Sequence, residues 1–157
     1  AVDLIKGLGR VLGMEVVDVP GATGYYDTNY EGKANAAVAI LEKMDLVYIH
    51  VEAPDEAGHN GDIREKIRAI ENFDRKIVGP VIDFLKEGGC AYRAMVIPDH
   101  PTPVKLRTHT ADPVPFAICG TGIEPDDVTV FTEKAAKFGS MGIKKGSDLM
   151  KILLSKD

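Results

Sequence analysis

Carboxylates and imidazoles gather in the stretch VEAPDEAGHNGD, residues 51–62, at the end of the apolar run LVYIHV. Asp55 and His59 lie four residues apart in it, so one turn of helix would point both side chains the same way. Such a pair can bind a divalent transition metal. Loops also collect Asp, Asn and Gly for turn chemistry alone, so this pair by itself leaves a polar loop as the alternative.

Two further segments carry the same residue types. Asp99 and His100 are adjacent in VIPDHPTP, directly after the apolar run YRAMVI, and His109 lies in RTHT shortly beyond. Open α/β sheets place their sites beyond the carboxyl ends of strands, which is where these loops are expected. The remaining histidine, His50, lies inside an apolar run, and we expect it to be packed in the core.

Five ligands of this kind exceed the needs of one tetrahedral metal with an open position. Two metals about 3.5–4 Å apart would use them, and such a pair stabilises the attacking and leaving oxygens of a phosphoryl transfer. The mixed Asp and His set without cysteine favours Mn²⁺, Zn²⁺, Co²⁺ or Fe²⁺ over Ca²⁺. Arg107 is the favoured phosphate ligand among the nearby basic residues, because arginine binds phosphate through two parallel hydrogen bonds. The alternative for Arg107, as for Lys33, Arg64 and Lys105, is a solvated charge.

The elements that must position these residues alternate along the chain. Apolar periodicity predicts helices at about 2–12, 30–43, 63–86 and 147–154, and strands at 15–19, 45–51, 92–97, 114–119 and 128–131. Asp62 is expected to cap the long helix with Glu65 as its reciprocal partner, and Pro80 to kink it. The sequence therefore predicts an α/β fold, a mostly parallel sheet flanked by helices, within a single domain spanning residues 1–157.

Composition narrows the class of protein. The 157 residues carry a net charge of −5 with dispersed basic residues, which argues against a nucleic-acid surface. No apolar stretch reaches the roughly 18 residues of a membrane span, and no secretory signal is visible, so a cytoplasmic location is expected. Cys90 and Cys119 belong to no CxxC pair and are expected to be buried thiols. The first residue, Ala1, precedes helical periodicity without a cap, which suggests a piece of a longer protein, with removal of an initiator methionine as the alternative.

Four motifs together resemble the archaeal-type cofactor-independent phosphoglycerate mutases of the alkaline phosphatase superfamily: GATGYYDTNYEGKA, IHVEAPDEAGHNGD, VIPDHPTP and RTHTADPVPF. The resemblance implies part of an alkaline-phosphatase-like domain with two divalent metal ions. Mn²⁺ is favoured, with Zn²⁺, Co²⁺ or Mg²⁺ as alternatives. It assigns Asp55, His59 and His109 to one metal and Asp99 with His100 to the other.

The resemblance also implies a reaction. Enzymes of this family interconvert 3-phosphoglycerate and 2-phosphoglycerate through a phosphoserine, in glycolysis and gluconeogenesis. Their serine nucleophile, a further metal-binding aspartate and an inserted substrate-binding domain have no match in this chain, which resembles the C-terminal portion. We therefore expect no catalytic residue in the chain and no activity without the N-terminal part of the enzyme. We also expect weak or absent metal binding at Asp99 and His100, and an exposed sheet edge that favours self-association.

Two alternatives remain open at this point. Another enzyme of the same superfamily, such as a phosphopentomutase or a metal-dependent phosphatase or sulfatase, would use nearly the same ligands. A non-catalytic metal-binding or subunit-interaction module would need a partner chain.

Overall fold

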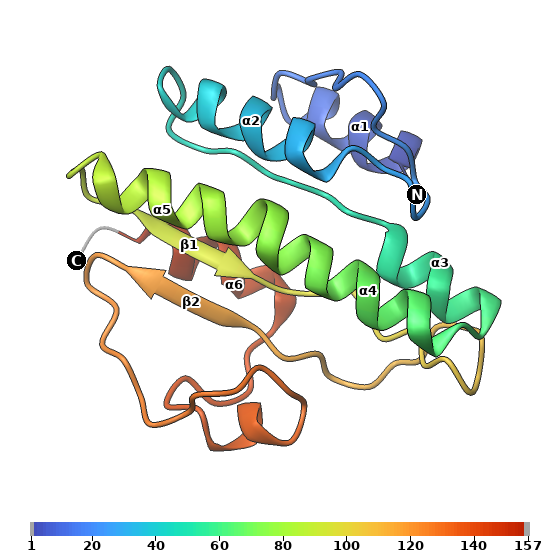
Figure 1. Ribbon diagram of the computed structural model, residues 1–157. Helices are drawn as coiled ribbons and strands as arrows, with labels where there is room; N and C mark the ends of the chain where they lie inside the picture. Colours follow the sequence, from blue (N-terminus) through green and yellow to red (C-terminus); the bar gives the residue numbers. More distant parts are fainter. Residues whose placement is uncertain (1, 156–157) are drawn as a thin grey trace. The chain divides into compact units, whose positions relative to one another are not determined.

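The computed structural model describes residues 2–155 (Figure 1). The chain divides into two compact units. The first consists of Ala1–Gly88 with Thr102–His109, and the second of Gly89–Pro101 with Thr110–Asp157.

The first unit is helical, and a long helix made of three successive segments organises it. This helix confirms the prediction for 63–86, and it continues past Pro80 through a π-helical turn in which the Gly79 N–H donates to the Asp74 carbonyl. The wider turn accommodates Pro80, which has no N–H and whose ring would contact a carbonyl of the preceding α-helical turn. The segments of the unit are α1 (Val2–Val11), α2 (Tyr30–Leu41), α3 (Ala53–Asn60), α4 (Ile63–Phe73), the π-helical Asp74–Val78 and α5 (Gly79–Glu87).

The core of the first unit lies where α2 packs along the long helix (Figure 1). Small residues of α2, Ala34 and Ala37, allow close approach to Ile77 and Val81, and all four are buried. The other end of the long helix is different, because Ile63 and Ile67 are 61% and 52% exposed although they continue the same apolar stripe. The apolar face of the long helix is therefore buried near Ile77 and Val81 and exposed near Ile63 and Ile67.

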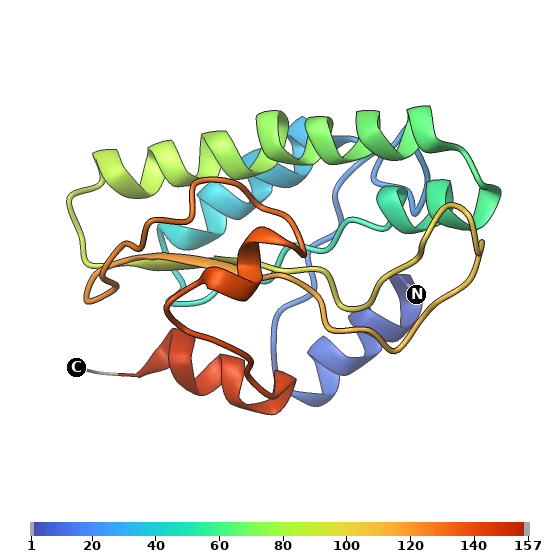
Figure 2. The same cartoon turned by 90° about the horizontal axis from the view of Figure 1, so that it is seen from below.

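The second unit contains a two-stranded antiparallel sheet, and the helix α6 (Gly146–Leu154) packs against its first strand (Figure 2). In this register Arg93 pairs with Gly120, where φ is +119° and an added Cβ would lie 2.1 Å from the Tyr92 carbonyl oxygen, so only glycine fits. The Arg93 guanidinium also donates to the carbonyls of Thr121, at 2.7 Å, and Ile152, at 3.3 Å, which ties the strand to α6. The elements are β1 (Arg93–Val96), β2 (Ala117–Gly120), the 3₁₀ segment Ala135–Phe138 and α6 (Gly146–Leu154).

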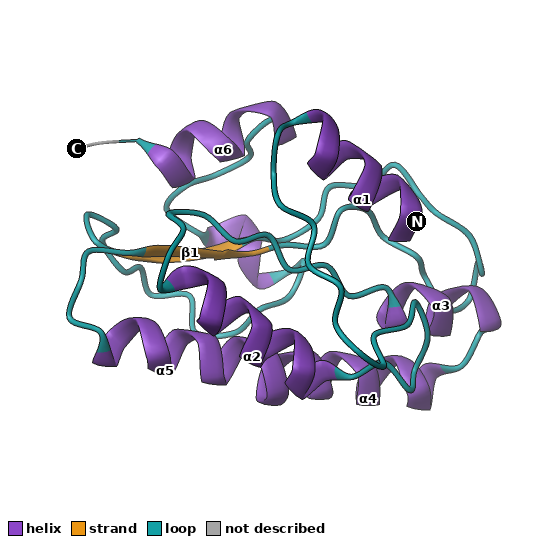
Figure 3. Ribbon diagram, turned by 90° about the horizontal axis from the view of Figure 1, so that it is seen from above, coloured by secondary structure: helices purple, strands orange, loops and turns teal. Residues whose placement is uncertain are grey.

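The expected mostly parallel sheet is not formed within residues 2–155, where the paired strands are only β1 and β2, and these are antiparallel. Residues 15–19, 45–51 and 128–131, which were predicted as strands, are loops (Figure 3). In the second of these, alternate residues still pack against the core, namely Val47, Ile49 and Val51. The apolar run was therefore a true sign of partial burial, but a strand needs a paired neighbour, and within residues 2–155 the sheet consists of β1 and β2.

Both cysteines contradict the prediction of burial, since Cys90 and Cys119 are exposed free thiols. Cys90 lies in the loop after α5, and Cys119 is on the uncovered face of β2, whose residues alternate between exposed and half-buried. Within residues 2–155, no helix is both long and apolar enough to cross a membrane.

Candidate metal centre

Two of the candidate ligands, Asp55 and His59, lie on α3, a two-turn helix where a loop containing one helical turn was predicted. Pro54 in the first turn has the φ angle that a helix needs, and Gly61 ends the helix in the left-handed conformation with φ +72°. The four-residue spacing then brings the Asp55 and His59 side chains together, with 3.4 Å between Asp55 Oδ2 and His59 Nε2. Their predicted common orientation is confirmed.

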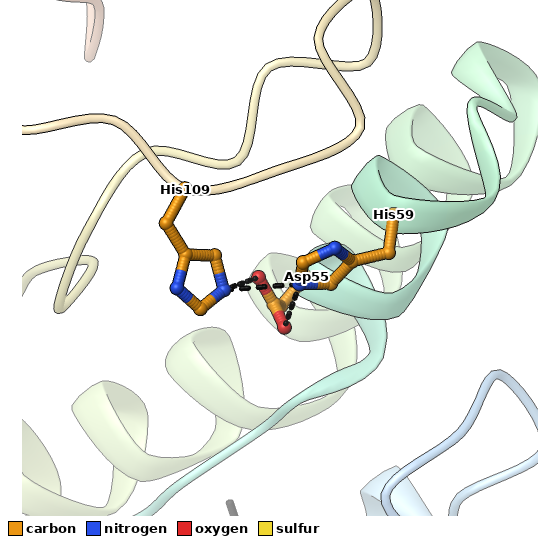
Figure 4. Close-up of side chains that lie close together, drawn as sticks. All are labelled: Asp55, His59 and His109. Atoms are coloured by element: carbon orange, nitrogen blue, oxygen red, sulfur yellow. Dashed lines mark hydrogen bonds and ion pairs between the residues drawn. The ribbon is translucent and has the colours of Figure 1, made fainter.

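The third candidate ligand, His109, lies in the loop 102–109 of the same unit. Its Nε2 lies 3.4 Å from Asp55 Oδ1 and 3.0 Å from His59 Nε2. Figure 4 shows the two imidazole rings pointing toward each other and toward the Asp55 carboxylate. The ligand atoms of these three residues all lie within 4.8 Å of one another.

These separations fit a common cation. Two ligands about 2.0–2.1 Å from a tetrahedral ion are separated by about 3.3 Å, close to the observed 3.0–3.4 Å. The chemistry of the donors agrees, because His59 Nδ1 lies 3.1 Å from the Arg107 carbonyl oxygen, which can only accept a hydrogen bond. In the neutral ring Nδ1 therefore carries the proton, and Nε2 presents its lone pair to the other two ligands.

The backbone of Arg107 is held in an unusual conformation at this contact. Its φ of +56° makes it the one non-glycine residue with positive φ in the part of the chain described, at a cost of about 1–2 kcal/mol. Its guanidinium lies directly over Gly61, where an added Cβ would be 2.4 Å from Nε. The left-handed Arg107 backbone and the bare surface of Gly61 together let the Arg107 carbonyl reach the ring of His59.

A threonine that the sequence analysis missed contacts the Asp55 carboxylate. The Thr102 hydroxyl donates to Asp55 Oδ1, and Thr102 itself is 4% exposed. Its carbonyl accepts from Lys66 Nζ at 2.6 Å, and Gly58 makes room for it, since a Cβ there would lie 2.4 Å from the Thr102 carbonyl oxygen. A signal was present in the sequence, because Thr102 belongs to the PDHPTP motif that supplied two predicted ligands.

Asp99 and His100 lie in the second unit, where they contact each other. Asp99 Oδ1 accepts the backbone N–H of His100 at 3.0 Å, and Asp99 Oδ2 lies 3.4 Å from His100 Nε2. Neither residue belongs to a group of three potential ligands among residues 2–155. Their role as ligands of a second metal stays a prediction.

Two other sets of charged residues are possible ligands of a metal or a phosphate: the acidic residues of α3 with Glu52, and Lys33. Glu52 and Glu56 form a second close set with Asp55, of a kind that is common without an ion. Lys33, one of the basic residues considered for phosphate, donates instead to the His50 carbonyl at 2.7 Å. Burial lowers the pKa of Lys33, an effect partly offset by the nearby Glu52 carboxylate.

The sequence has clear relatives. The sequence model of the Metalloenzyme superfamily matches residues 1–156. The chain is 55% identical over 155 residues to a 2,3-bisphosphoglycerate-independent phosphoglycerate mutase of Methanothrix thermoacetophila, covering 99% of this chain and 40% of the relative. A protein of the same name from Metallosphaera sedula is 46% identical, with 99% and 37% covered. The chain thus spans about two fifths of the length of these relatives.

One solved structure has the same fold. The PH0037 protein from Pyrococcus horikoshii superposes with a TM-score of 0.91 at 36% identity, and the match covers 100% of this chain and 48% of that one.

Proposed function

We propose that this chain, which belongs to the Metalloenzyme superfamily, is the metal-binding C-terminal portion of a cofactor-independent phosphoglycerate mutase. The observation that carries the proposal is the convergence of Asp55, His59 and His109 within 4.8 Å, with His59 held in the tautomer that a metal ligand needs. The names of relatives 45–55% identical to the chain favour phosphoglycerate over a phosphopentose or a simple phosphate ester.

In this proposal the three side chains hold one divalent ion, with Mn²⁺ as the favoured species and Zn²⁺, Co²⁺ or Mg²⁺ as alternatives. Asp99 and His100 contribute to a second ion. A bound metal pair offsets negative charge on the oxygens of a transferring phosphoryl group. Arg107 offers its guanidinium to the phosphate of phosphoglycerate, while its carbonyl orients His59.

The nucleophile is the part of the reaction that this chain does not supply. In this proposal the phosphoryl-accepting serine belongs to a part of the whole enzyme that this chain does not match. We therefore expect the chain to act together with the remaining part of the same enzyme, in the cytoplasm, and to be inactive alone. We also expect residues 45–51 to join a mostly parallel sheet in the whole protein, within one domain.

Reconstitution tests the proposal. The chain is mixed with the separately produced N-terminal part of the enzyme and Mn²⁺, and conversion of 3-phosphoglycerate to 2-phosphoglycerate is measured. Activity is expected from the mixture and from neither part alone, and Asp55→Ala or His59→Ala should abolish it. The matched control is Asp83→Ala, which removes an exposed carboxylate of α5 in the same unit. Full activity from this chain alone, or from the Asp55→Ala mixture, would contradict the proposal.

A further inference from the structure

We propose that Thr102 is a positioning residue that fixes the Asp55 carboxylate in the orientation in which it faces both histidines. The inference rests on the proposed metal-binding function of the Asp55, His59 and His109 group. It adds a residue that does not itself contact the metal and that differs from the predicted ligands in chemical type.

The direction of the hydrogen bond follows from the groups involved. An ionised carboxylate can only accept, so the Thr102 hydroxyl donates its proton to Asp55 Oδ1. The terminal torsion of an aspartate is otherwise broad, and the carboxylate would rotate about it. With Oδ1 fixed by Thr102, Oδ2 is directed toward His59 Nε2 at 3.4 Å. One hydroxyl therefore sets the direction of both carboxylate oxygens.

Burial distinguishes this hydroxyl from a surface contact. Thr102 is 4% exposed, whereas the Asp55 side chain is 24% exposed and so remains open toward the ligands. A charge-assisted O–H···O⁻ bond shielded from water is stronger than a neutral one in solvent. The Asp55 carboxylate is thus bonded to a buried hydroxyl while part of its own side chain stays accessible.

The backbone of Thr102 is itself held by two contacts from different helices. Lys66 of α4 donates to its carbonyl at 2.6 Å. Gly58 of α3 lies so close that a Cβ would be 2.8 Å from Thr102 Cγ2 and 2.4 Å from its carbonyl oxygen. These contacts fix where the hydroxyl lies relative to α3, so the Asp55 orientation is set before any metal binds.

The test compares two substitutions at one position, using the whole 157-residue chain. Thr102→Val keeps the shape and removes the hydroxyl, while Thr102→Ser keeps the hydroxyl and removes a methyl group. The Kd for Mn²⁺ is measured from the electron paramagnetic resonance signal of the free ion. Loss of a hydrogen-bond partner of a metal ligand costs about 10–100-fold in affinity. We expect that loss for Thr102→Val, and a Kd within about threefold of wild type for Thr102→Ser.

Two results would overturn the inference: a Thr102→Val Kd within threefold of wild type, or a Thr102→Ser Kd as high as that of Thr102→Val, which would assign the effect to methyl packing. Circular dichroism and thermal unfolding without metal establish that the variants fold. If Thr102→Val does not fold, Lys66→Met replaces it. A severalfold rise in its Kd supports the inference, and an unchanged Kd contradicts it.

The same data separate this inference from the proposed function. Wild-type chain that binds no Mn²⁺, or His59→Ala chain that binds it as tightly as wild type, contradicts the metal centre itself. Wild-type binding that needs His59 but is unaffected by Thr102→Val contradicts only the role of Thr102.

Discussion

The two sets of predicted metal ligands differ in how the chain holds them. His59 and His109 come from segments 50 residues apart, yet their Nε2 atoms lie 3.0 Å from each other beside the Asp55 carboxylate. Asp99 and His100 are adjacent in sequence and contact each other, but they belong to no group of three potential ligands among residues 2–155. Nearness along the chain is therefore a poor guide to which potential ligands converge in such a group.

The contacts of the two aspartates explain the difference. Asp55 Oδ1 accepts from the buried Thr102 hydroxyl, so a separate segment determines its orientation. Asp99 Oδ1 accepts from the backbone N–H of the next residue, a local turn contact, and its side chain is 60% exposed. Among residues 2–155, the Asp55 carboxylate is thus oriented by a contact with a separate segment, and the Asp99 carboxylate by a contact within its own loop. The chain should therefore bind its first metal ion mainly through Asp55.

Removing a ligand from the assembled set should have the largest effect. His59→Ala is expected to raise the Kd for Mn²⁺ by about 100-fold or more, since losing a ligand costs more than the 10–100-fold typical of a supporting contact. Isothermal titration calorimetry measures the Kd, and Asp83→Ala should leave it unchanged. A rise of less than fivefold would mean that His59 does not bind the ion.

The contact between α3 and the loop 102–109 should be next in effect. Gly58→Ala places a Cβ 2.4 Å from the Thr102 carbonyl oxygen, and the forced shift should destabilise the chain by about 1–3 kcal/mol and weaken Mn²⁺ binding. The matched control is Gly7→Ala in α1, where nothing lies within 4 Å and stability should rise by about 0.5–1 kcal/mol. Urea unfolding measures the stability of both variants. Equal stability of Gly58→Ala and wild type would show that the loop yields at no cost.

Structural features that depend on residues close together in the sequence could be predicted. The cap of α4 is as predicted, since Asp62 Oδ1 accepts from the N–H groups of Arg64 and Glu65, each at 3.0 Å. The expected reciprocal bond is replaced, because the Glu65 side chain pairs with Arg68 at 2.6 Å. A helix cap involves residues within one turn, so its residue types suffice to predict it. Where a side chain such as Glu65 has two partners within reach, the geometry of the folded chain decides which of them it pairs with.

Non-local pairing could not be predicted in the same way. Residue type was sufficient to mark Asp55, His59 and His109 as candidate ligands, together with Asp99 and His100, because few residue types bind metals and the chain has four histidines. The assignment of the first three to one metal came from the family resemblance. Thr102 has no such distinguishing chemistry, and its role depends on its approach to Gly58. The prediction of a mostly parallel sheet is not confirmed within residues 2–155 for the same reason, because a short apolar run indicates burial of a segment and says nothing of the strand that it pairs with.

A smaller effect on Mn²⁺ affinity is expected from substitution of Arg107, because its backbone carbonyl, and not its side chain, accepts the hydrogen bond from His59. Arg107→Gly relieves the positive φ of +56° and should stabilise the chain by about 1 kcal/mol, while the carbonyl that accepts from His59 Nδ1 remains. Mn²⁺ affinity should stay within about threefold of wild type. The nitrogen chemical shifts of the His59 ring, measured by NMR without metal, should still report a proton on Nδ1. Arg107→Val, which disfavours positive φ, is the contrasting variant, and loss of the tautomer in both would assign the effect to the guanidinium.

The smallest effect is expected in the second unit, where it tests the comparison most directly. His100→Ala removes one member of the Asp99 pair and leaves in place the hydrogen bonds from Thr102 to Asp55 and between His59 and Arg107. The Kd for the first Mn²⁺ should therefore change by less than about twofold, against the roughly 100-fold loss from His59→Ala. Calorimetry on the two variants side by side measures the ratio. Equal losses would mean that His100 helps to bind the same ion, and the two sets of ligands would then form one site.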